Sequence, residues 1–292
     1  MRLLTTSEAA DYLRLSERKL YELVADRGVP CTKASGKWLF PQEELDRWLM
    51  SELSRPPGLG PRRAPGIVGG SQDSLLEWAL RESGSGLATL TEGSEAGVRR
   101  LLADEVTAAA IHYHHADDED GNLRLTRTRP GLHDCVLIAF AIREQGLLVA
   151  PGNPRGLGGL EDALASGARF AMRQKGAGAQ MLLEVLLARH GRSVADVPAL
   201  PARCLTGPDL AEAVRAGHAD CGFATRAAAR AAGLDFIPVT QERFDLLMRQ
   251  AAYFRPPMQA LAACLRGGAM AERAGALGGY DTSDAGAVRW AP

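Results

Sequence analysis

The sequence predicts a two-domain protein in which a small α+β module precedes a larger α/β domain. Three observations lead to this fold class. Residues 54–66 contain four prolines, three glycines and three arginines without apolar periodicity, as in an exposed linker. Helical patterns and a hairpin signal precede this stretch, and short apolar runs alternate with helical windows after it. We therefore expect domains at residues 1–53 and 66–292, with the linker at 54–65.

The composition is that of an ordinary soluble globular protein. Hydrophobic residues make up 46% and charged residues 24% of the 292 positions, and the formal net charge of −1 excludes a generally basic nucleic-acid coat. No stretch approaches the roughly 20 apolar residues of a membrane span. Residues 1–6 lack the apolar core of a secretory signal. The five cysteines have no metal or redox spacing, which favours reduced thiols and a cytoplasmic location.

Two short helices with a tight turn between them are predicted near the N-terminus. Thr5 to Glu8 form a capping-box pattern that begins the first helix, and Ser16 is suited to cap the second. The inner face of the second helix is apolar at Leu20, Leu23 and Val24. This spacing is typical of a helix-turn-helix. The outer face of the second helix presents groups suited to phosphates and base edges, on Arg18, Lys19 and Tyr21.

A hairpin and a third helix follow. Ser35 and Gly36 are a hairpin turn signal, with Lys33 and Lys37 on either side. Pro41 suits the first position of a helix that continues to Leu49.

The order of these features resembles the MerR-like, excisionase-type winged helix-turn-helix. The resemblance is carried by residues 4–13, the turn at 15–18 and residues 36–49. It implies binding to double-stranded DNA, with the second helix in the major groove and the wing on the backbone. The implied groove contacts are Ser16, Arg18, Lys19 and Tyr21, and the implied wing contacts are Lys33, Ser35 and Lys37. A solvated helix face and a surface hairpin are the alternative.

The small, weakly basic module is expected to bind DNA weakly as a single copy. Two copies on paired half-sites would give useful affinity, so we expect a homodimer or higher homo-oligomer.

The larger domain shows the β–α alternation of parallel sheets covered by helices. The expected strands are short and apolar, at 66–69, 86–90, 108–111, 136–140, 147–150, 169–172 and 221–224. The expected helices are amphipathic, at 73–82, 95–103, 179–190, 209–216 and 225–232.

Four segments of this domain carry a second resemblance, at 70–73, 143–154, 227–236 and 277–286. With them, residues 66–287 resemble the type II periplasmic-binding-protein-like domain of bacterial regulators. Related domains accompany molybdenum-cofactor biosynthesis and molybdate- or tungstate-responsive regulation. The resemblance implies two α/β lobes, crossed by hinge strands, that close on a ligand. It favours molybdate or tungstate as the effector and implies no cofactor.

The residue pattern also predicts an anion site. Arg173 to Ala179 follow a strand and open a long helix, where free N–H groups, glycines and a nearby cation favour an anion. Ala177 and Ala179 occupy positions where relatives often have hydroxyl residues. The backbone amides and Lys175 are therefore the groups of this turn that are left to contact an anion. Other turns supply hydroxyls. The expected ligand contacts are Ser71, Thr91, Ser94, His112, Arg173, Lys175, Gly176, Ala177, Gly178, Ala179 and Tyr280.

Other functional signals are weaker. Residues 112–120 combine three histidines with four acids, but the run leaves a strand end, where alternate residues point apart. We therefore assign no metal ligands and place only His112 near the cleft. Arg143 and Gln145, on a predicted crossing strand, fit hinge structure or ligand contact equally.

No nucleophile elbow, phosphate-binding loop or paired zinc motif occurs, so an enzyme is not expected. The sequence predicts a ligand-responsive transcriptional regulator. The alternatives are the same architecture sensing a small organic anion, or a protein that handles molybdenum-cofactor precursors.

Overall fold

The computed structural model describes residues 2–26, 28–34, 36–51, 65–114 and 120–292. These residues fall into two compact units, Met1–Pro61 and Arg62–Pro292. The expected linker, apart from Pro65, lies outside the described residues.

The N-terminal unit is a small α+β fold with a three-stranded antiparallel sheet in the order β1-β3-β2. Its elements are β1 (Leu3–Leu4), α1 (Thr6–Leu13), α2 (Glu17–Ala25), β2 (Thr32–Ala34), β3 (Lys37–Pro41) and α3 (Gln42–Ser51). The predicted capping box is present, because Thr5 N–H donates to the Glu8 carboxylate at 2.8 Å and Glu8 N–H donates to Thr5 Oγ1 at 3.4 Å. Pro41 ends β3 and does not open α3, which corrects the predicted helix start by one residue.

The core of this unit is small and apolar. Leu20 from α2 and Phe40 from β3 are fully buried, and Ala9 and Leu45 pack with them. Leu23 and Val24 lie partly buried against this core, as the predicted inner face of α2 requires. The opposite face of α2 is thereby left exposed.

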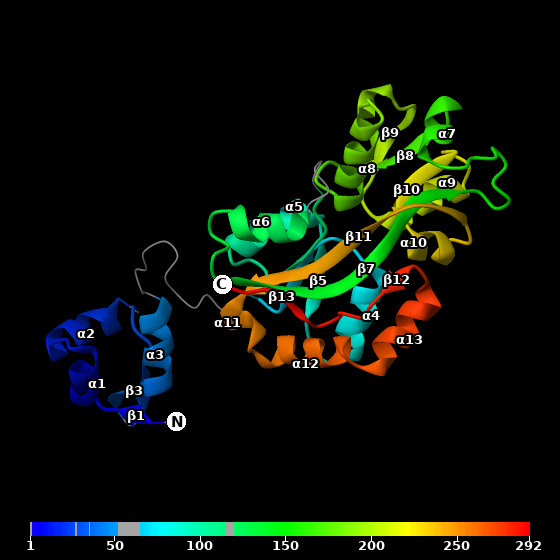
Figure 1. Ribbon diagram of the computed structural model, residues 1–292. Helices are drawn as coiled ribbons and strands as arrows, with labels where there is room; N and C mark the ends of the chain where they lie inside the picture. The colour runs from blue at the N-terminus through cyan, green and yellow to red at the C-terminus, as the bar shows by residue number, and fades with distance from the viewer. Residues whose placement is uncertain (1, 27, 35, 52–64, 115–119) are drawn as a thin grey trace. The chain divides into compact units, whose positions relative to one another are not determined.

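The C-terminal unit is built on one ten-stranded sheet that runs through two lobes (Figure 1). The strand order is β5-β4-β6-β11-β7-β10-β8-β9, and β12 and β13 also pair with β7. Its strands are β4 (Ile67–Gly70), β5 (Ala88–Thr91), β6 (Ala108–Ile111), β7 (Cys135–Val149), β8 (Phe170–Arg173), β9 (Ala199–Cys204), β10 (Cys221–Thr225), β11 (Asp235–Arg249), β12 (Tyr280–Asp281) and β13 (Val288–Trp290). Its α-helices are α4 (Ser74–Glu82), α5 (Ser94–Leu102), α6 (Gly121–Thr128), α7 (Leu160–Ala165), α8 (Gly178–Arg189), α9 (Gly207–Arg215), α10 (Arg226–Ala231), α11 (Gln250–Tyr253), α12 (Pro256–Leu265) and α13 (Gly268–Leu277), and Val194–Asp196 form a 3-10 turn.

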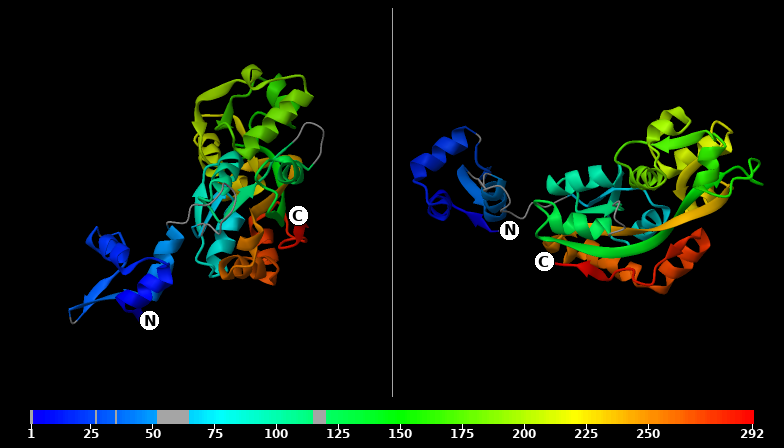
Figure 2. Two further views of the ribbon diagram at one scale, coloured as in Figure 1. Left: turned by 90° about the vertical axis from the view of Figure 1, so that its left-hand side faces the viewer. Right: turned by 45° about the horizontal axis from the view of Figure 1, so that its top comes forward.

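Two long antiparallel strands, β7 and β11, connect the lobes and pair along their whole length (Figure 2). Lobe I contains the parallel strands β4, β5 and β6, and β6 pairs with the far part of β11. Lobe II contains the parallel strands β8, β9 and β10, and β10 pairs with the end of β7. The predicted two-lobed α/β fold with crossing hinge strands is confirmed.

Each lobe buries both faces of its part of the sheet. In lobe I, α4, α12 and α13 cover one face around Leu75 and Phe140, and α5 covers the other around Val98. In lobe II, α8 packs on one face with Phe170, and α9 packs on the other with Leu210. Strands buried on both faces appear in a sequence as short continuous apolar runs, which is why β4, β6, β8 and β10 were predicted. The sequence did not predict β9, which is largely exposed and lacks such a run.

The crossing strands differ in extent from the predicted runs. The runs at 136–140 and 147–150 belong to one strand, β7, whose middle is polar. The partner strand β11 was not predicted at all, because polar residues at 240–243 interrupt its apolar pattern. No helix among the described residues has the length and apolar character needed to cross a membrane.

Gly146 of β7 lies opposite Pro238 of β11, at a point where a side chain has no room. A Cβ atom added there would lie 2.1 Å from the Ile237 carbonyl oxygen and 2.8 Å from Phe236 Cζ. We predict that Gly146→Ala lowers the free energy of unfolding by about 2 kcal/mol or more, because the strands must separate to admit the methyl group. Urea denaturation of the full chain measures this loss.

The matched control is Gly275→Ala in α13, where an added Cβ meets nothing within 4 Å. This variant is expected to be neutral or slightly stabilising, since alanine is a better helix former. Equal stability of the two variants would refute the steric account of Gly146.

Candidate functional site

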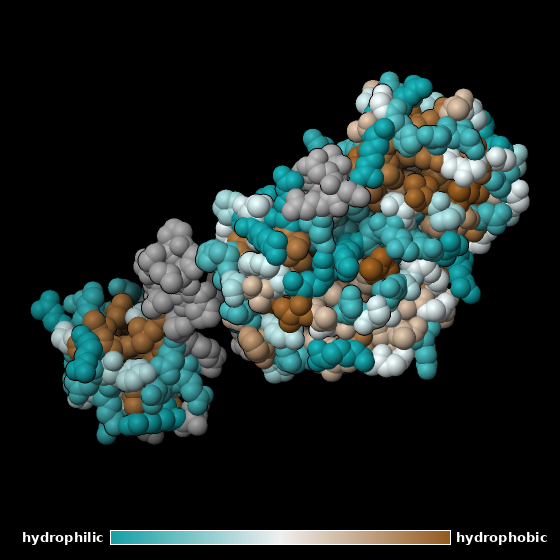
Figure 3. Space-filling model, in the orientation of Figure 1, coloured by the Kyte–Doolittle hydropathy of each residue, from teal (hydrophilic) through white to brown (hydrophobic). Residues whose placement is uncertain are grey.

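A cleft lies between the two lobes, with the crossing strands at its base. Its lining comes from both lobes and from the hinge, and consists of Ser71, Gln72, Asp73, Ser74, His112, Arg143, Gln145, Arg173, Gly178, Ala179, Gly207, Pro208, Ala224, Thr225 and Ala228. The volume of the cleft is about 30 Å³, which is room for about two water molecules. The surface where the lobes meet is mostly hydrophilic on the face drawn in Figure 3. The cleft between the lobes is therefore small and polar.

Three helices of nine residues or more begin at the cleft: α4, α8 and α9. In α4 and α9 one N–H of the first turn has a side-chain acceptor, since Leu76 N–H donates to Asp73 and Asp209 N–H donates to Thr206. In α8, the N-cap residue Ala177 makes no side-chain capping bond in the described structure, and Gly178 and Ala179 line the cleft. The start of α8 therefore presents backbone N–H groups and the positive end of a helix dipole to the cleft.

Arg173 supplies a cation beside this helix start. Its guanidinium donates to the carbonyl oxygens of Cys204, at 3.3 Å, and Leu205, at 2.8 Å. Burial lowers the pKa of Arg173 to about 10, which still leaves the side chain charged at neutral pH. Both of these hydrogen-bond partners are neutral carbonyls, so the positive charge of Arg173 can still attract an anion.

The base of the cleft is a buried network centred on Arg143. Its side chain is 2% exposed and donates to Asp73 Oδ2 at 2.8 Å and to Glu242 Oε1. Gln145 Nε2 donates to the same Glu242 oxygen at 2.5 Å, and the Tyr280 hydroxyl donates to Asp73 Oδ2 at 2.9 Å.

The charged groups of this network stabilise one another in their ionised forms. Burial alone would raise the pKa of Glu242, but Arg143 and His112 lower it well below its usual range. Burial likewise disfavours the charged form of Arg143, yet Glu242 and Asp73 outweigh it and raise the pKa of Arg143. Both side chains are therefore ionised, and the cleft has a fixed, charged base.

Hydroxyl and imidazole groups complete the lobe I side. Ser71 Oγ and Ser94 Oγ are 2.8 Å apart, and Ser94 Oγ also accepts from His112 N–H at 3.1 Å. His112 Nδ1 lies 2.7 Å from Glu242 Oε2. Burial lowers the pKa of His112 to about 4, so its ring is neutral at physiological pH.

The structure brings five of the predicted ligand contacts into the cleft lining: Ser71, His112, Arg173, Gly178 and Ala179. Ser94 lies directly behind Ser71 and is fully buried. The other predicted contacts, Thr91, Lys175, Gly176, Ala177 and Tyr280, are outside the lining.

Each of these placements has a local reason. Lys175 is exposed, and Gly176 packs beside Glu95 at the edge of the lobes. Thr91 borders a separate hollow next to β4. Tyr280 is turned toward Asp73 and supports the base of the cleft from β12.

Sequence reasoning missed Glu242 because it lies on the unpredicted strand β11. For Arg143 and Gln145, the sequence did not distinguish a role in the hinge from contact with a ligand. In the structure both residues lie on the crossing strand β7 and line the cleft. Asp73 was part of a quoted motif, but nothing in its surroundings in the sequence indicated its buried partner Arg143.

The predicted DNA-contacting residues lie on the surface of the N-terminal unit. Arg18, Lys19 and Tyr21 are exposed on α2, where Glu22 pairs with both basic side chains at 3.3 and 3.2 Å. Ser16 Oγ accepts from Lys19 N–H at 3.2 Å and caps α2. Lys33 and Lys37 flank the β2–β3 turn, and Lys33 lies over the Trp38 ring at 5.3 Å. Ser35 lies outside the described residues.

Family models match both units. A helix-turn-helix domain model matches residues 3–52, and a PBP superfamily domain model matches residues 76–266. The chain belongs to the PBP superfamily. Its PBP-like domain, joined to a helix-turn-helix domain, fits a ligand-sensing transcriptional regulator rather than an enzyme.

Individual relatives are distant. The uncharacterized protein YvgK of Bacillus subtilis (strain 168) is 24% identical over 260 residues, which cover 84% of each chain. The solved structure of a cysteine-to-serine mutant of OxyR from Corynebacterium glutamicum, with hydrogen peroxide bound, has a TM-score of 0.50 at 16% identity and covers 93% of this chain and 91% of its own. The effector-binding domain of QuiR in complex with shikimate has a TM-score of 0.48 at 12% identity and covers 68% of this chain and 93% of its own.

The buried Arg143 network leads to a stability prediction. Arg143→Met leaves Glu242 and Asp73 without their shared cation, so the free energy of unfolding should fall by about 3–5 kcal/mol. The matched control is Arg155→Met, which breaks a pair with Asp220 in which the arginine side chain is 40% exposed. That change should cost about 1 kcal/mol or less. Similar losses in urea denaturation would contradict the central role of Arg143.

Proposed function

We propose that this protein is a transcriptional regulator that senses a small oxyanion in the interlobe cleft, with molybdate or tungstate as the leading effectors. The observation that carries the proposal is the convergence of the uncapped α8 start, the Arg173 guanidinium and the Ser71 hydroxyl on one small cleft. Backbone amides, a cation and hydroxyls are the groups that bind a tetrahedral oxyanion.

The character of the lining favours an inorganic anion over a larger organic one. Its apolar side chains are Ala179, Pro208, Ala224 and Ala228, and the described lining contains no phenylalanine, tyrosine, tryptophan or branched aliphatic residue. Organic ligands usually bury their skeleton against such larger groups. Molybdate and tungstate come first because of the family resemblance of residues 66–287.

Unsatisfied polar atoms also support a bound ligand. Within the described residues, Arg143 Nε and Gln145 Oε1 are buried without a hydrogen-bond partner, and both side chains line the cleft. A buried donor without an acceptor costs about 1–3 kcal/mol. An anion, or water that accompanies it, would supply the missing acceptor for Arg143.

DNA binding is assigned to α2 and the β2–β3 wing, as the winged-helix resemblance implies. We further propose that the protein acts as a homodimer or higher homo-oligomer, since one weakly basic unit neutralises few phosphates. Ligand affinity must differ between the open and closed lobes for the anion to change DNA binding.

The anion proposal predicts selective binding that depends on the cleft. Calorimetry with molybdate, tungstate, sulfate, phosphate and small carboxylates should show one tight oxyanion site per chain. Arg173→Ala and Ser71→Ala should each weaken it about tenfold or more, because each removes a hydrogen bond to a charged ligand. Arg192→Ala, which removes an exposed arginine just beyond the C-terminal end of α8, is the matched control and should change affinity less than twofold.

A carboxylate that binds tightly where no oxyanion does would replace this proposal with the organic-anion alternative. Turnover of a cofactor precursor by a protein that ignores DNA would favour the precursor-handling alternative.

The DNA proposal predicts opposite effects at neighbouring positions of α2. Arg18→Ala and Lys19→Ala should weaken binding to a duplex selected from a random pool, and each should lower the salt dependence by about one counterion. Glu22→Gln should strengthen binding, because it removes the acid that pairs with both basic side chains. Fluorescence anisotropy at several salt concentrations measures these effects, with Arg192→Ala as the unaffected control. Unchanged affinity in the Arg18 and Lys19 variants would refute the assignment of α2.

A further inference from the structure

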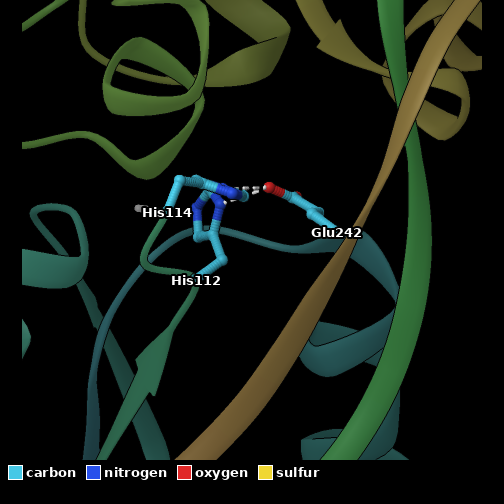
Figure 4. A group of neighbouring side chains, drawn as sticks. All are labelled: His112, His114 and Glu242. Atoms are coloured by element: carbon cyan, nitrogen blue, oxygen red, sulfur yellow. Dashed lines mark hydrogen bonds and ion pairs between the residues drawn. The ribbon is translucent and has the colours of Figure 1, made fainter. Parts of the chain in front are cut away.

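His112, His114 and Glu242 form a cluster at the side of the cleft (Figure 4). His112 Nδ1 lies 2.7 Å and His114 Nε2 lies 3.0 Å from the same atom, Glu242 Oε2. The three side chains are 6%, 12% and 0% exposed, respectively. The two histidines come from the segment after β6 and the glutamate from β11, so three ligand-type atoms meet from distant parts of the chain, within 4.8 Å of one another.

The surroundings hold these three groups in place. The other oxygen of the glutamate, Oε1, accepts from Arg143 and Gln145, which leaves Oε2 to face the two rings. The backbone N–H of His112 donates to Ser94 Oγ, which fixes the position of this residue. Its ring also lies against Gly178, where an added Cβ would meet ring atoms at 2.3–2.4 Å. Hydrogen bonds of this kind to the ligating groups are what orient the ligands of a metal ion.

The ligand types indicate the type of ion. Two imidazole nitrogens and one carboxylate oxygen lie within 4.8 Å of one another, and together they form a donor set of two histidines and one carboxylate. Imidazole ligands suit zinc, iron, cobalt and nickel, whereas calcium and magnesium prefer oxygen ligands alone.

We propose that His112 Nδ1, His114 Nε2 and Glu242 Oε2 bind a divalent transition-metal ion. Its remaining positions would take water or a ligand from the cleft, which His112 also lines. Each imidazole binds a metal through an unprotonated nitrogen, so a proton shared with the carboxylate moves, by exchange with water, to the other nitrogen of the same ring when the ion binds. This inference does not rest on the proposed oxyanion, because it needs only these three side chains.

The test is calorimetric titration of the tag-free, EDTA-treated full chain with Zn²⁺, with no oxyanion or DNA present. One ion per chain should bind in the micromolar range or tighter. His114→Ala should weaken binding at least tenfold, since it removes one of three ligands while leaving the Glu242–Arg143 pair intact. The matched control, His218→Ala, removes an exposed histidine outside the cluster and should change the affinity less than twofold.

The absorption spectrum of the protein titrated with Co²⁺ gives a second readout. Visible bands that appear on titration and are lost in His114→Ala would support binding by these side chains, whereas bands that His114→Ala leaves unchanged would contradict it. Absence of stoichiometric binding by the wild-type chain, or full retention by a folded His114→Ala variant, would overturn the proposal. A failed oxyanion titration with a successful metal titration would overturn only the proposed effector, and the reverse result only the metal site.

Discussion

The buried ion pair between Arg143 and Glu242 is the interaction on which the PBP-like domain depends. The two residues face each other in the register of β7 and β11, where both strands pass from one lobe to the other. Removing a partner from such a pair costs more than the pair itself contributes, since an uncompensated charge stays behind. Asp73 connects the pair to the start of α4, and Tyr280 connects it to β12. Hinge, helix start and cleft base are thereby held in one arrangement.

The charges of the cleft connect the proposed anion and metal sites. Arg143 and Arg173 are balanced by Asp73 and Glu242, so the fixed charges of these four side chains sum to zero. A doubly charged oxyanion would enter this space with only local dipoles and the Arg173 charge in its favour. A divalent cation at His112, His114 and Glu242 would supply the opposite charge nearby. The two sites are therefore electrostatically complementary, although each stands on its own contacts.

Local sequence signals predicted most of the secondary structure and part of the cleft. These signals depend only on residues that are close together in the chain, so they can be recognised in the sequence. Examples are the caps at Thr5 and Ser16, the apolar runs of the parallel strands and the helix start after Arg173. Glu242 could not be found in this way, because its role depends on two residues far from it in the sequence. It pairs with Arg143 on β7 and contacts His112, which follows β6. The cluster of His112, His114 and Glu242 was not predicted for the same reason: the histidines lie two residues apart, and β11 supplies the carboxylate that meets both rings. Lys175 was predicted to contact the ligand because it lies beside the glycines, whereas the structure places it on the surface, outside the described lining of the cleft.

The path of the chain through the sheet has a consequence for biosynthesis. Lobe I is discontinuous: β6 ends at Ile111, but its neighbour in the sheet, the last part of β11, is synthesised only after β8, β9 and β10 of lobe II. The first part of β11 pairs with the lobe II end of β7, so this one strand completes both lobes. Contacts between such distant segments slow folding and leave strands unpaired in the meantime. We therefore expect the newly made chain to be most prone to aggregation before β11 leaves the ribosome.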